Sequence, residues 1–168
     1  YVKDLNHFYR DTPAFWQVDY SWEGFQWIVP DDSKQSVIAF LRRDAAGKMI
    51  LIVCNFNPVL RKDYQMGVPN PGSYKEILNS DDKKYGGTGV TNGTVKAKKG
   101  PMHGFDQHIS LTLPPLSTIY LSVPAARKPK AEKPTTEKAA DKPAKTAKKP
   151  VAKKAAKPTA KADAPAAE

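Results

Sequence analysis

The first residues of the chain carry apolar side chains at helical spacing. Val2, Leu5, Phe8 and Tyr9 recur along one helix face, and Pro13 closes the segment because proline cannot donate to a continuing helix. So short a helix is not stable alone, so its apolar face needs a partner. The visible sequence offers no matching segment, and we expect that partner to lie outside it.

From residue 24 onward the pattern changes to short apolar runs separated by turn residues. This is typical of an antiparallel β-sandwich or barrel. We expect strands, in chain order, at residues 24–29, 36–43, 49–56, 64–68, 73–78 and 94–98. The run at 49–56 is apolar on both faces, which predicts a central strand that is covered on two sides.

The clearest alternation of apolar and polar positions comes last. Residues 109–113 and 119–123 each place an apolar side chain at every second position, and the connection between them contains two prolines. We interpret the pair as a closing β-hairpin. The predicted fold class is therefore all-β: an antiparallel β-sandwich that follows a short helix.

Composition divides the chain near Pro124. Residues 1–124 hold every Trp, Tyr and Phe, with 14 basic and 12 acidic residues, whereas residues 125–168 hold 13 basic and 5 acidic residues among Ala, Lys and Pro. In the second part proline interrupts helix, like charges repel, and no bulky apolar residue offsets the entropy of ordering. We expect residues 125–168 to be a disordered tail.

A single cysteine, Cys54, lies within an apolar run. With no second cysteine a disulfide framework is excluded, and a buried thiol is typical of a reducing compartment. No apolar run approaches the roughly 20 residues of a membrane helix. We therefore expect a cytoplasmic protein without a membrane partner.

Candidate catalytic and cofactor motifs are better explained by turns. Asp31–Asp32 and Asp81–Asp82 are adjacent loop carboxylates, which usually form turns. The glycine-rich run 85–89 lacks the Lys-Ser/Thr ending of a phosphate loop, so it is interpreted as a tight loop that needs positive φ. The three histidines do not have zinc-binding spacing. We expect no catalytic residue, no metal site and no cofactor in this chain.

Two other features have a binding interpretation beside a structural one. Aromatic residues are dense between residues 15 and 27, where they suit sugar stacking, although core or interface packing accounts for most of them. The lysines of the tail suit non-specific contact with a polyanion such as nucleic acid, or they simply keep the tail solvated.

Specific strings along residues 1 to about 124 resemble the C-terminal end of bacterial glycogen (1,4-α-glucan) branching enzymes. The strings before residue 50 are Asp4-Leu5-Asn6, Tyr9-Arg10, Pro13-Ala14, Asp19, Gly24-Phe25-Gln26-Trp27-Ile28, Asp31-Asp32, Ser36-Val37, Phe40 and Arg42. The later ones are Val53-Cys54-Asn55-Phe56, Arg61, Tyr64, Gly67-Val68-Pro69, Gly72, Tyr74, Leu78-Asn79-Ser80-Asp81, Tyr85-Gly86-Gly87 and Leu113-Pro114-Pro115-Leu116.

The resemblance implies an α-amylase-like glycosyltransferase with a central (β/α)8 barrel between two β-sandwiches. Such an enzyme cuts an α-1,4-glucan chain and reattaches it through an α-1,6 linkage, using carboxylates at the ends of barrel strands. None of these carboxylates has a counterpart here. By the resemblance, residues 1–23 correspond to the last helix and exit segment of a missing catalytic barrel, and residues 24–124 to the C-terminal β-sandwich.

We therefore expect an accessory domain of a branching enzyme that is inactive alone, with the missing barrel and α-glucan or glycogen as its partners. The candidate glucan contacts are Trp22, Trp27 and Tyr85, as aromatic stacking platforms. Two alternatives stay open: a stand-alone carbohydrate-binding module, and a nucleic-acid or other polyanion binder that acts through the basic tail.

Overall fold

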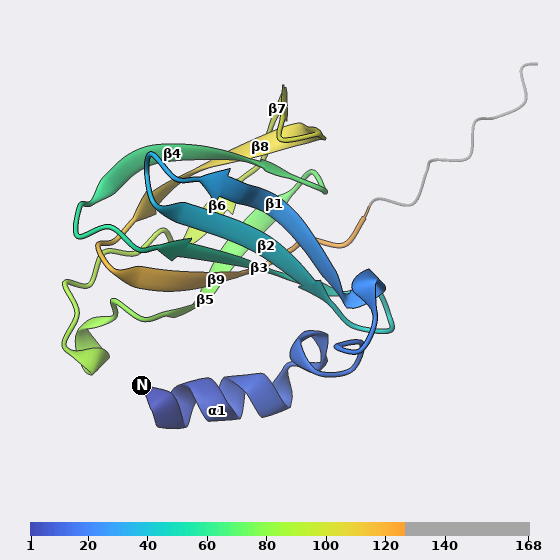
Figure 1. Cartoon of the computed structure of the whole chain (residues 1–168), viewed down its shortest axis with the longest axis horizontal. Coiled ribbons are helices and arrows are strands. Elements are labelled where there is room, and N and C mark those ends of the chain that lie inside the picture. The colour runs from blue at the N-terminus through green and yellow to red at the C-terminus, as the bar shows by residue number, and fades with distance from the viewer. Residues whose placement is uncertain (127–168) are drawn as a thin grey trace, which may run out of the picture. The chain divides into compact units, whose positions relative to one another are not determined.

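Nine strands and one α-helix account for most of residues 1–126, which this computed structural model describes (Figure 1). The larger sheet contains β1 (Phe25–Asp32), β2 (Val37–Arg43), β3 (Met49–Asn55), β5 (Ser73–Asn79), β6 (Thr94–Lys96) and β9 (Ser117–Ser122). The smaller sheet contains β4 (Arg61–Val68), β7 (Lys98–Met102) and β8 (Phe105–Leu113). The tail predicted to be disordered lies, apart from its first two residues, outside the described residues, and that prediction stays open.

The two sheets have the strand orders β1-β2-β3-β9-β5-β6 and β4-β8-β7, and all paired strands are antiparallel. Their facing sides share one aliphatic core, which includes Leu51, Val53, Ile109, Leu111 and Leu121, each at most 1% exposed. The predicted antiparallel β-sandwich is confirmed.

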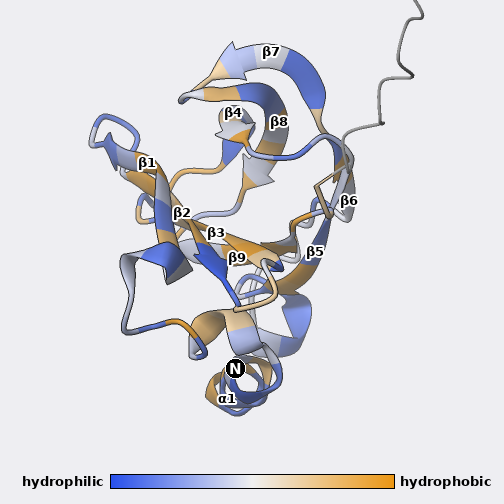
Figure 2. Ribbon diagram, turned by 90° about the vertical axis from the view of Figure 1, so that its right-hand side faces the viewer, coloured by the Kyte–Doolittle hydropathy of each residue, from blue (hydrophilic) through white to orange (hydrophobic). Residues whose placement is uncertain are grey.

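Strand β3 is covered on both sides, as its sequence predicted. Leu51 and Val53 face the core between the sheets, whereas Ile50, Ile52 and Cys54 join a second cluster on the other side of the sheet. Figure 2 shows hydrophobic residues along β2 and β3, between α1 below and the smaller sheet above. Burial raises the pKa of the Cys54 thiol, so it stays protonated and packs as a small hydrophobe.

Helix α1 (Val2–Asp11) ends just before Pro13, as predicted, and a 3₁₀ turn, η1 (Pro13–Phe15), follows it. The expectation that its apolar face finds no partner in this chain was wrong in part. The Phe8 ring lies 5.2 Å from that of Phe15 and 5.3 Å from that of Tyr120 on β9. Tyr120 supplies this contact because it alternates to the outer face of the larger sheet, away from the core.

The predicted closing hairpin is wrong. Strand β8 pairs with β4 and β7, and β9 pairs with β3 and β5, so the two strands lie in different sheets. Both alternate because both present one side to the same core, and alternation alone cannot distinguish neighbours in a sheet from strands that face each other across a core. The segment Pro114–Leu116 crosses between the layers.

The strand predicted at 94–98 is divided at Ala97. Residues 94–96 form β6 at the edge of the larger sheet, and β7 begins at Lys98 in the smaller sheet. The Ala97 N–H donates to the Gly72 carbonyl at 2.8 Å, at the point where the chain passes from one sheet to the other. The inward alternation of Val95 and Ala97 is kept through the crossing.

Candidate functional site

Aromatic side chains line the outer face of the larger sheet. Strand pairing places Trp27 opposite Phe40, and Phe25 lies on the same side. The ring centroids are 4.9 Å apart for Phe25 and Trp27, 5.2 Å for Phe25 and Phe40, and 5.8 Å for Trp27 and Phe40. We call these three residues the aromatic triplet. Its Trp27 side chain is 49% exposed, so the triplet offers an open aromatic surface.

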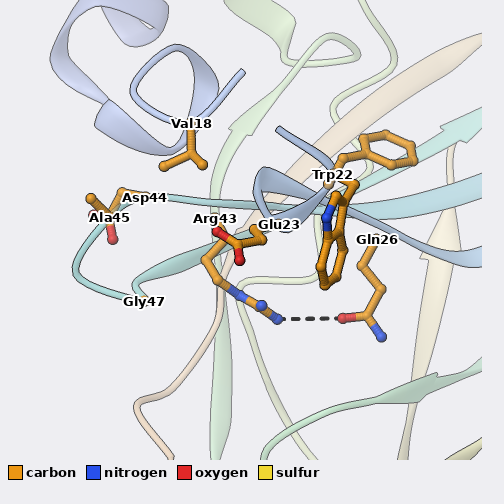
Figure 3. A pocket seen from close by; sticks show the side chains of 9 residues that line it. Val18, Trp22, Glu23, Gln26, Arg43, Asp44, Ala45 and Gly47 are labelled. Carbon is orange, nitrogen blue, oxygen red and sulfur yellow. Dashed lines mark hydrogen bonds between the residues drawn. The ribbon is translucent and has the colours of Figure 1, made fainter. Parts of the chain in front are cut away.

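A depression of about 600 Å³ adjoins the triplet, and Phe25 belongs to both. We call it the Trp22 depression, because the Trp22 side chain is 85% exposed at its wall. Figure 3 shows the Trp22 indole beside Gln26, with Arg43 reaching toward the Gln26 amide. The Arg43 Nη2 donates to Gln26 Oε1 at 3.4 Å. The lining is Val18, Trp22, Glu23, Phe25, Gln26, Arg43, Asp44, Ala45 and Gly47.

The local sequence explains why Trp22 points outward. Residues Trp22–Gly24 form a 3₁₀ turn, η2, in which the Glu23 N–H donates to the Ser21 hydroxyl at 3.3 Å. A Cβ at Gly24 would lie 2.1 Å from the Val18 carbonyl oxygen, so only glycine allows the turn to pack this closely. The turn therefore holds Trp22 at the start of β1 with its ring in solvent.

Arg42 fastens the segment before β1 to the sheet. Its Nη2 donates to the Phe15 carbonyl at 2.9 Å and its Nε to the Ala14 carbonyl at 3.4 Å. The same guanidinium forms an ion pair with Asp19. Guanidinium hydrogen bonds to several acceptors are directional, so this clamp fixes the path from α1 to η2.

Trp22 and Trp27, two of the three predicted contact residues, therefore lie on either side of Phe25. The sequence did not reveal Gln26 and Arg43 as polar neighbours of Trp22, and these two residues alternate to the opposite side of the sheet from Trp27 and Phe40. Only the pairing of β1 with β2 brings these two residues together, and neither belongs to a motif. Flat apolar faces beside planar hydrogen-bonding groups suit a ligand with the same alternation of surfaces.

Tyr85, the third predicted residue, belongs to a different cluster. It ends the 3₁₀ turn η3 (Lys83–Tyr85), and its hydroxyl donates to Asp4 of α1 at 2.7 Å. Its ring meets Tyr1 edge-on at a centroid distance of 5.1 Å, and the Lys84 ammonium lies 4.6 Å from its centre. Burial and the Asp4 hydrogen bond raise the pKa of Tyr85. The structure does not bring Tyr85 to the Trp22 depression.

Asp32 and Asp81 accept turn and loop hydrogen bonds, as predicted, although Asp31 and Asp32 end strand β1 and are not loop residues. Asp32 accepts from the Gln35 N–H at 3.2 Å and from the Tyr64 hydroxyl at 2.9 Å. Asp81 accepts from the N–H groups of Thr88 and Val90 at 2.9 and 3.2 Å. Burial would raise the pKa of Asp81, but hydrogen bonds from Thr88 and neighbouring N–H groups lower it.

The glycine-rich run is a tight loop, also as predicted. Gly86 and Gly89 have φ values of +84° and +80°, and a Cβ at Gly87 would lie 2.2 Å from the Asp81 carbonyl oxygen. Within residues 1–126, no three His, Cys, Asp or Glu side chains gather closely enough to hold a metal ion. No helix in that same part of the chain is both long and apolar enough to span a bilayer.

Comparison with known proteins identifies the family of the domain. Residues 27–124 match the family described as the alpha amylase, C-terminal all-beta domain. The chain belongs to this family. It is 50% identical over 121 residues to the 1,4-alpha-glucan branching enzyme GlgB of Rubrobacter xylanophilus, an alignment that covers 71% of this chain and 17% of that enzyme.

The enzymes of the same name from Aquifex aeolicus and Aromatoleum aromaticum are 53% and 47% identical over 122 residues. These alignments cover 71% and 72% of this chain and 19% of each relative. The resemblance to the C-terminal portion of branching enzymes is therefore confirmed. The chain spans about a fifth of the length of the curated relatives it matches.

Proposed function

We propose that this chain is the accessory C-terminal β-domain of a 1,4-α-glucan branching enzyme. The parent would transfer α-1,4-glucan segments to form α-1,6 branches in glycogen. The identity of about half of the aligned residues to enzymes of that name supports this assignment. Asp32 and Asp81 have turn-forming roles, and the catalytic carboxylates of the parent would lie on its barrel, so we expect this domain to be inactive alone.

We also propose the domain boundaries. Residues 1–23 would be the last helix and exit segment of the catalytic barrel, residues 24–124 the β-sandwich, and residues 125–168 an appended tail. The outward side of α1 supports the first assignment, because Val2 and Tyr9 remain 68% and 48% exposed after Phe8 has packed on the sheet. The helix would then lie between the barrel and the sandwich and contact both.

The proposed substrate contact is the stacking of α-glucan rings on Trp22 and Trp27. The single observation that carries it is the Trp22 depression, where an exposed indole adjoins the hydrogen-bonded pair Arg43 and Gln26 and the aromatic triplet. A glucose ring has an apolar face that suits the indole, and hydroxyls that suit the amide and guanidinium. Tyr85 is a weaker candidate, because Tyr1 and Lys84 already pack on its ring.

Native electrophoresis through glycogen tests the contact. The chain should be retarded, and soluble maltooligosaccharide should release it. Trp22→Ala and Trp27→Ala should each weaken retardation about fivefold to tenfold, equivalent to about 1–1.4 kcal/mol. Phe56→Ala is the matched control, because Phe56 is 59% exposed and belongs neither to the depression nor to the aromatic triplet.

Equal retardation of all three variants, or none for the wild-type chain, would refute glucan binding at this site. The assignment as an accessory domain has its own test. The chain should form no branches in amylose, measured as α-1,6 linkages after incubation, and branch formation by the chain alone would contradict it.

The cellular location of the protein and the role of its tail are proposals too. We propose a cytoplasmic location, supported by the single buried Cys54 thiol, which has no partner for a disulfide. Contact of residues 125–168 with a polyanion rests on charge alone and lies outside the described residues.

A further inference from the structure

Lysines gather where the chain passes between the two sheets. Lys96, Lys98 and Lys99 fall within four residues on β6 and β7, and all three side chains are exposed. Val95 and Ala97 turn toward the core, so Lys96 and Lys98 point outward, whereas Lys99 alternates to the opposite side of β7 from Lys98. Strand β5 adds exposed Lys75, which pairs with Thr94 of β6. We call these four residues the lysine edge.

The lysine edge forms no ion pair within the described domain, although the exposed Asp106 precedes Gln107 on β8. The ion pairs found there are Arg42 with Asp19 and Lys84 with Asp4. The cross-strand neighbours of Lys96, Lys98 and Lys99 are Ser73, His108 and Gln107. The nearby Glu76 carboxylate on β5 accepts hydrogen bonds from Thr91 and Asn92 instead.

The described part of the chain ends beside the lysine edge. The Pro124 carbonyl accepts from the Asn70 side chain at 2.8 Å, and a Cβ at Gly72 would lie 3.0 Å from Pro124. Gly72 in turn accepts from Ala97, between β6 and β7. The last described residues, Ala125 and Ala126, therefore follow from a point beside this edge.

We propose that the lysine edge binds the phosphate backbone of double-stranded nucleic acid without regard to sequence. Ammonium groups that form no ion pair in the described domain suit phosphates, and duplex DNA carries about one negative charge per 1.7 Å. The cross-strand neighbours of the β6 and β7 lysines include no Phe, Tyr or Trp on which unstacked bases could lie, which favours a duplex over a single strand. The inference does not depend on the glucan contact, which lies near the start of β1, at the other edge of the larger sheet.

Lysines on β6 and β7 also have a simpler explanation. Both strands are at sheet edges, and exposed lysines keep such edges from pairing with other molecules. The two roles make different predictions. If the lysines only protect the sheet edges, their loss should produce self-association. If they form a binding surface, their loss should lower the affinity for nucleic acid and the salt dependence of that binding.

The test uses the full chain and a fluorescent 20-base-pair DNA duplex, titrated between 50 and 200 mM salt. The edge variant combines Lys96→Gln, Lys98→Gln and Lys99→Gln. The control variant combines Lys34→Gln, Lys48→Gln and Lys62→Gln, which removes the same charge from exposed positions elsewhere, one of them on the edge strand β4. Sedimentation of each variant measures self-association.

Each lost phosphate contact should lower the slope of log K against log salt by about 0.9. The edge variant should therefore lose roughly two to three from the slope and bind at least about tenfold more weakly at 50 mM salt, with the control close to wild type. Equal losses in both variants would overturn the proposal in favour of net charge. Self-association with unchanged affinity would overturn it in favour of edge protection, and binding of polyphosphate but not of the duplex would exclude nucleic acid.

Discussion

The two faces of the larger sheet are built from the same strands but from different chemistry. The inner face is mainly aliphatic, with Tyr74 as its buried aromatic residue, and its Leu51 and Leu121 are fully buried against the smaller sheet. The outer face is aromatic and only partly covered: Phe8 packs on Tyr120, whereas Trp27 is half exposed. The inner face supplies stability by exclusion of water, and the outer face remains available for a ligand or another domain.

Alanine substitutions at adjacent residues of β3 allow the stability contributions of the two faces to be compared directly. Leu51→Ala on the inner face should lower the free energy of unfolding by about 3–4 kcal/mol, because a fully enclosed site cannot collapse around the cavity. Ile52→Ala on the outer face should cost about 2 kcal/mol, because partly exposed neighbours such as Phe15 and Phe40 can move in. Denaturant unfolding measures both, and an equal or larger loss for Ile52→Ala would contradict the comparison.

The next largest effect concerns how the outer face is covered. Arg42→Ala removes hydrogen bonds to two carbonyls and the ion pair with Asp19, and should destabilise the chain by about 2 kcal/mol. Arg43→Ala is the control, because its bonds to Gln26 and Met49 are long, and it should cost less than about 1 kcal/mol. Similar melting temperatures for the two variants would mean that the clamp does not hold α1 and η1 on the sheet.

The smallest effect concerns the far end of α1. Hydrogen bonds from Tyr85 and Lys84 lower the pKa of Asp4, so their stabilisation is complete above the unfolded value of about 3.9 and disappears as the pH falls through the folded value. Asp4→Asn should therefore lower Tm by on the order of 1–2 °C at pH 6 and by less below pH of about 4.

The matched variant for this effect is Asp31→Asn. Asp31 is an exposed aspartate whose side chain makes no hydrogen bond within residues 1–126, so the variant should show no such pH dependence. If the difference in Tm between Asp4→Asn and wild type were the same at pH 6 and below pH of about 4, the carboxylate charge of Asp4 would not be the cause of the stabilisation.

Features set by near neighbours in the chain could be predicted from the sequence. The end of α1 before Pro13, the two-sided burial of β3 and the turn role of Asp81 each depend on residues a few positions away. The density of aromatic residues likewise singled out Trp22 and Trp27, which the fold places on either side of Phe25.

Features that depend on long-range pairing could not be predicted from the sequence. Ile119 alternates as Ile109 does, yet the two belong to different sheets, because alternation does not identify the paired strand. Gln26 and Arg43 meet only through the pairing of β1 with β2, and Arg42 reaches back to Phe15 across η2 and β1. No local pattern marks either contact.

The position of β9 has a consequence for biosynthesis. This strand lies between β3 and β5, so without residues 117–122 the larger sheet is two separate pieces, β1-β2-β3 and β5-β6. A ribosome releases these residues after every other strand has been made. The domain therefore completes its fold only after translation of its last strand.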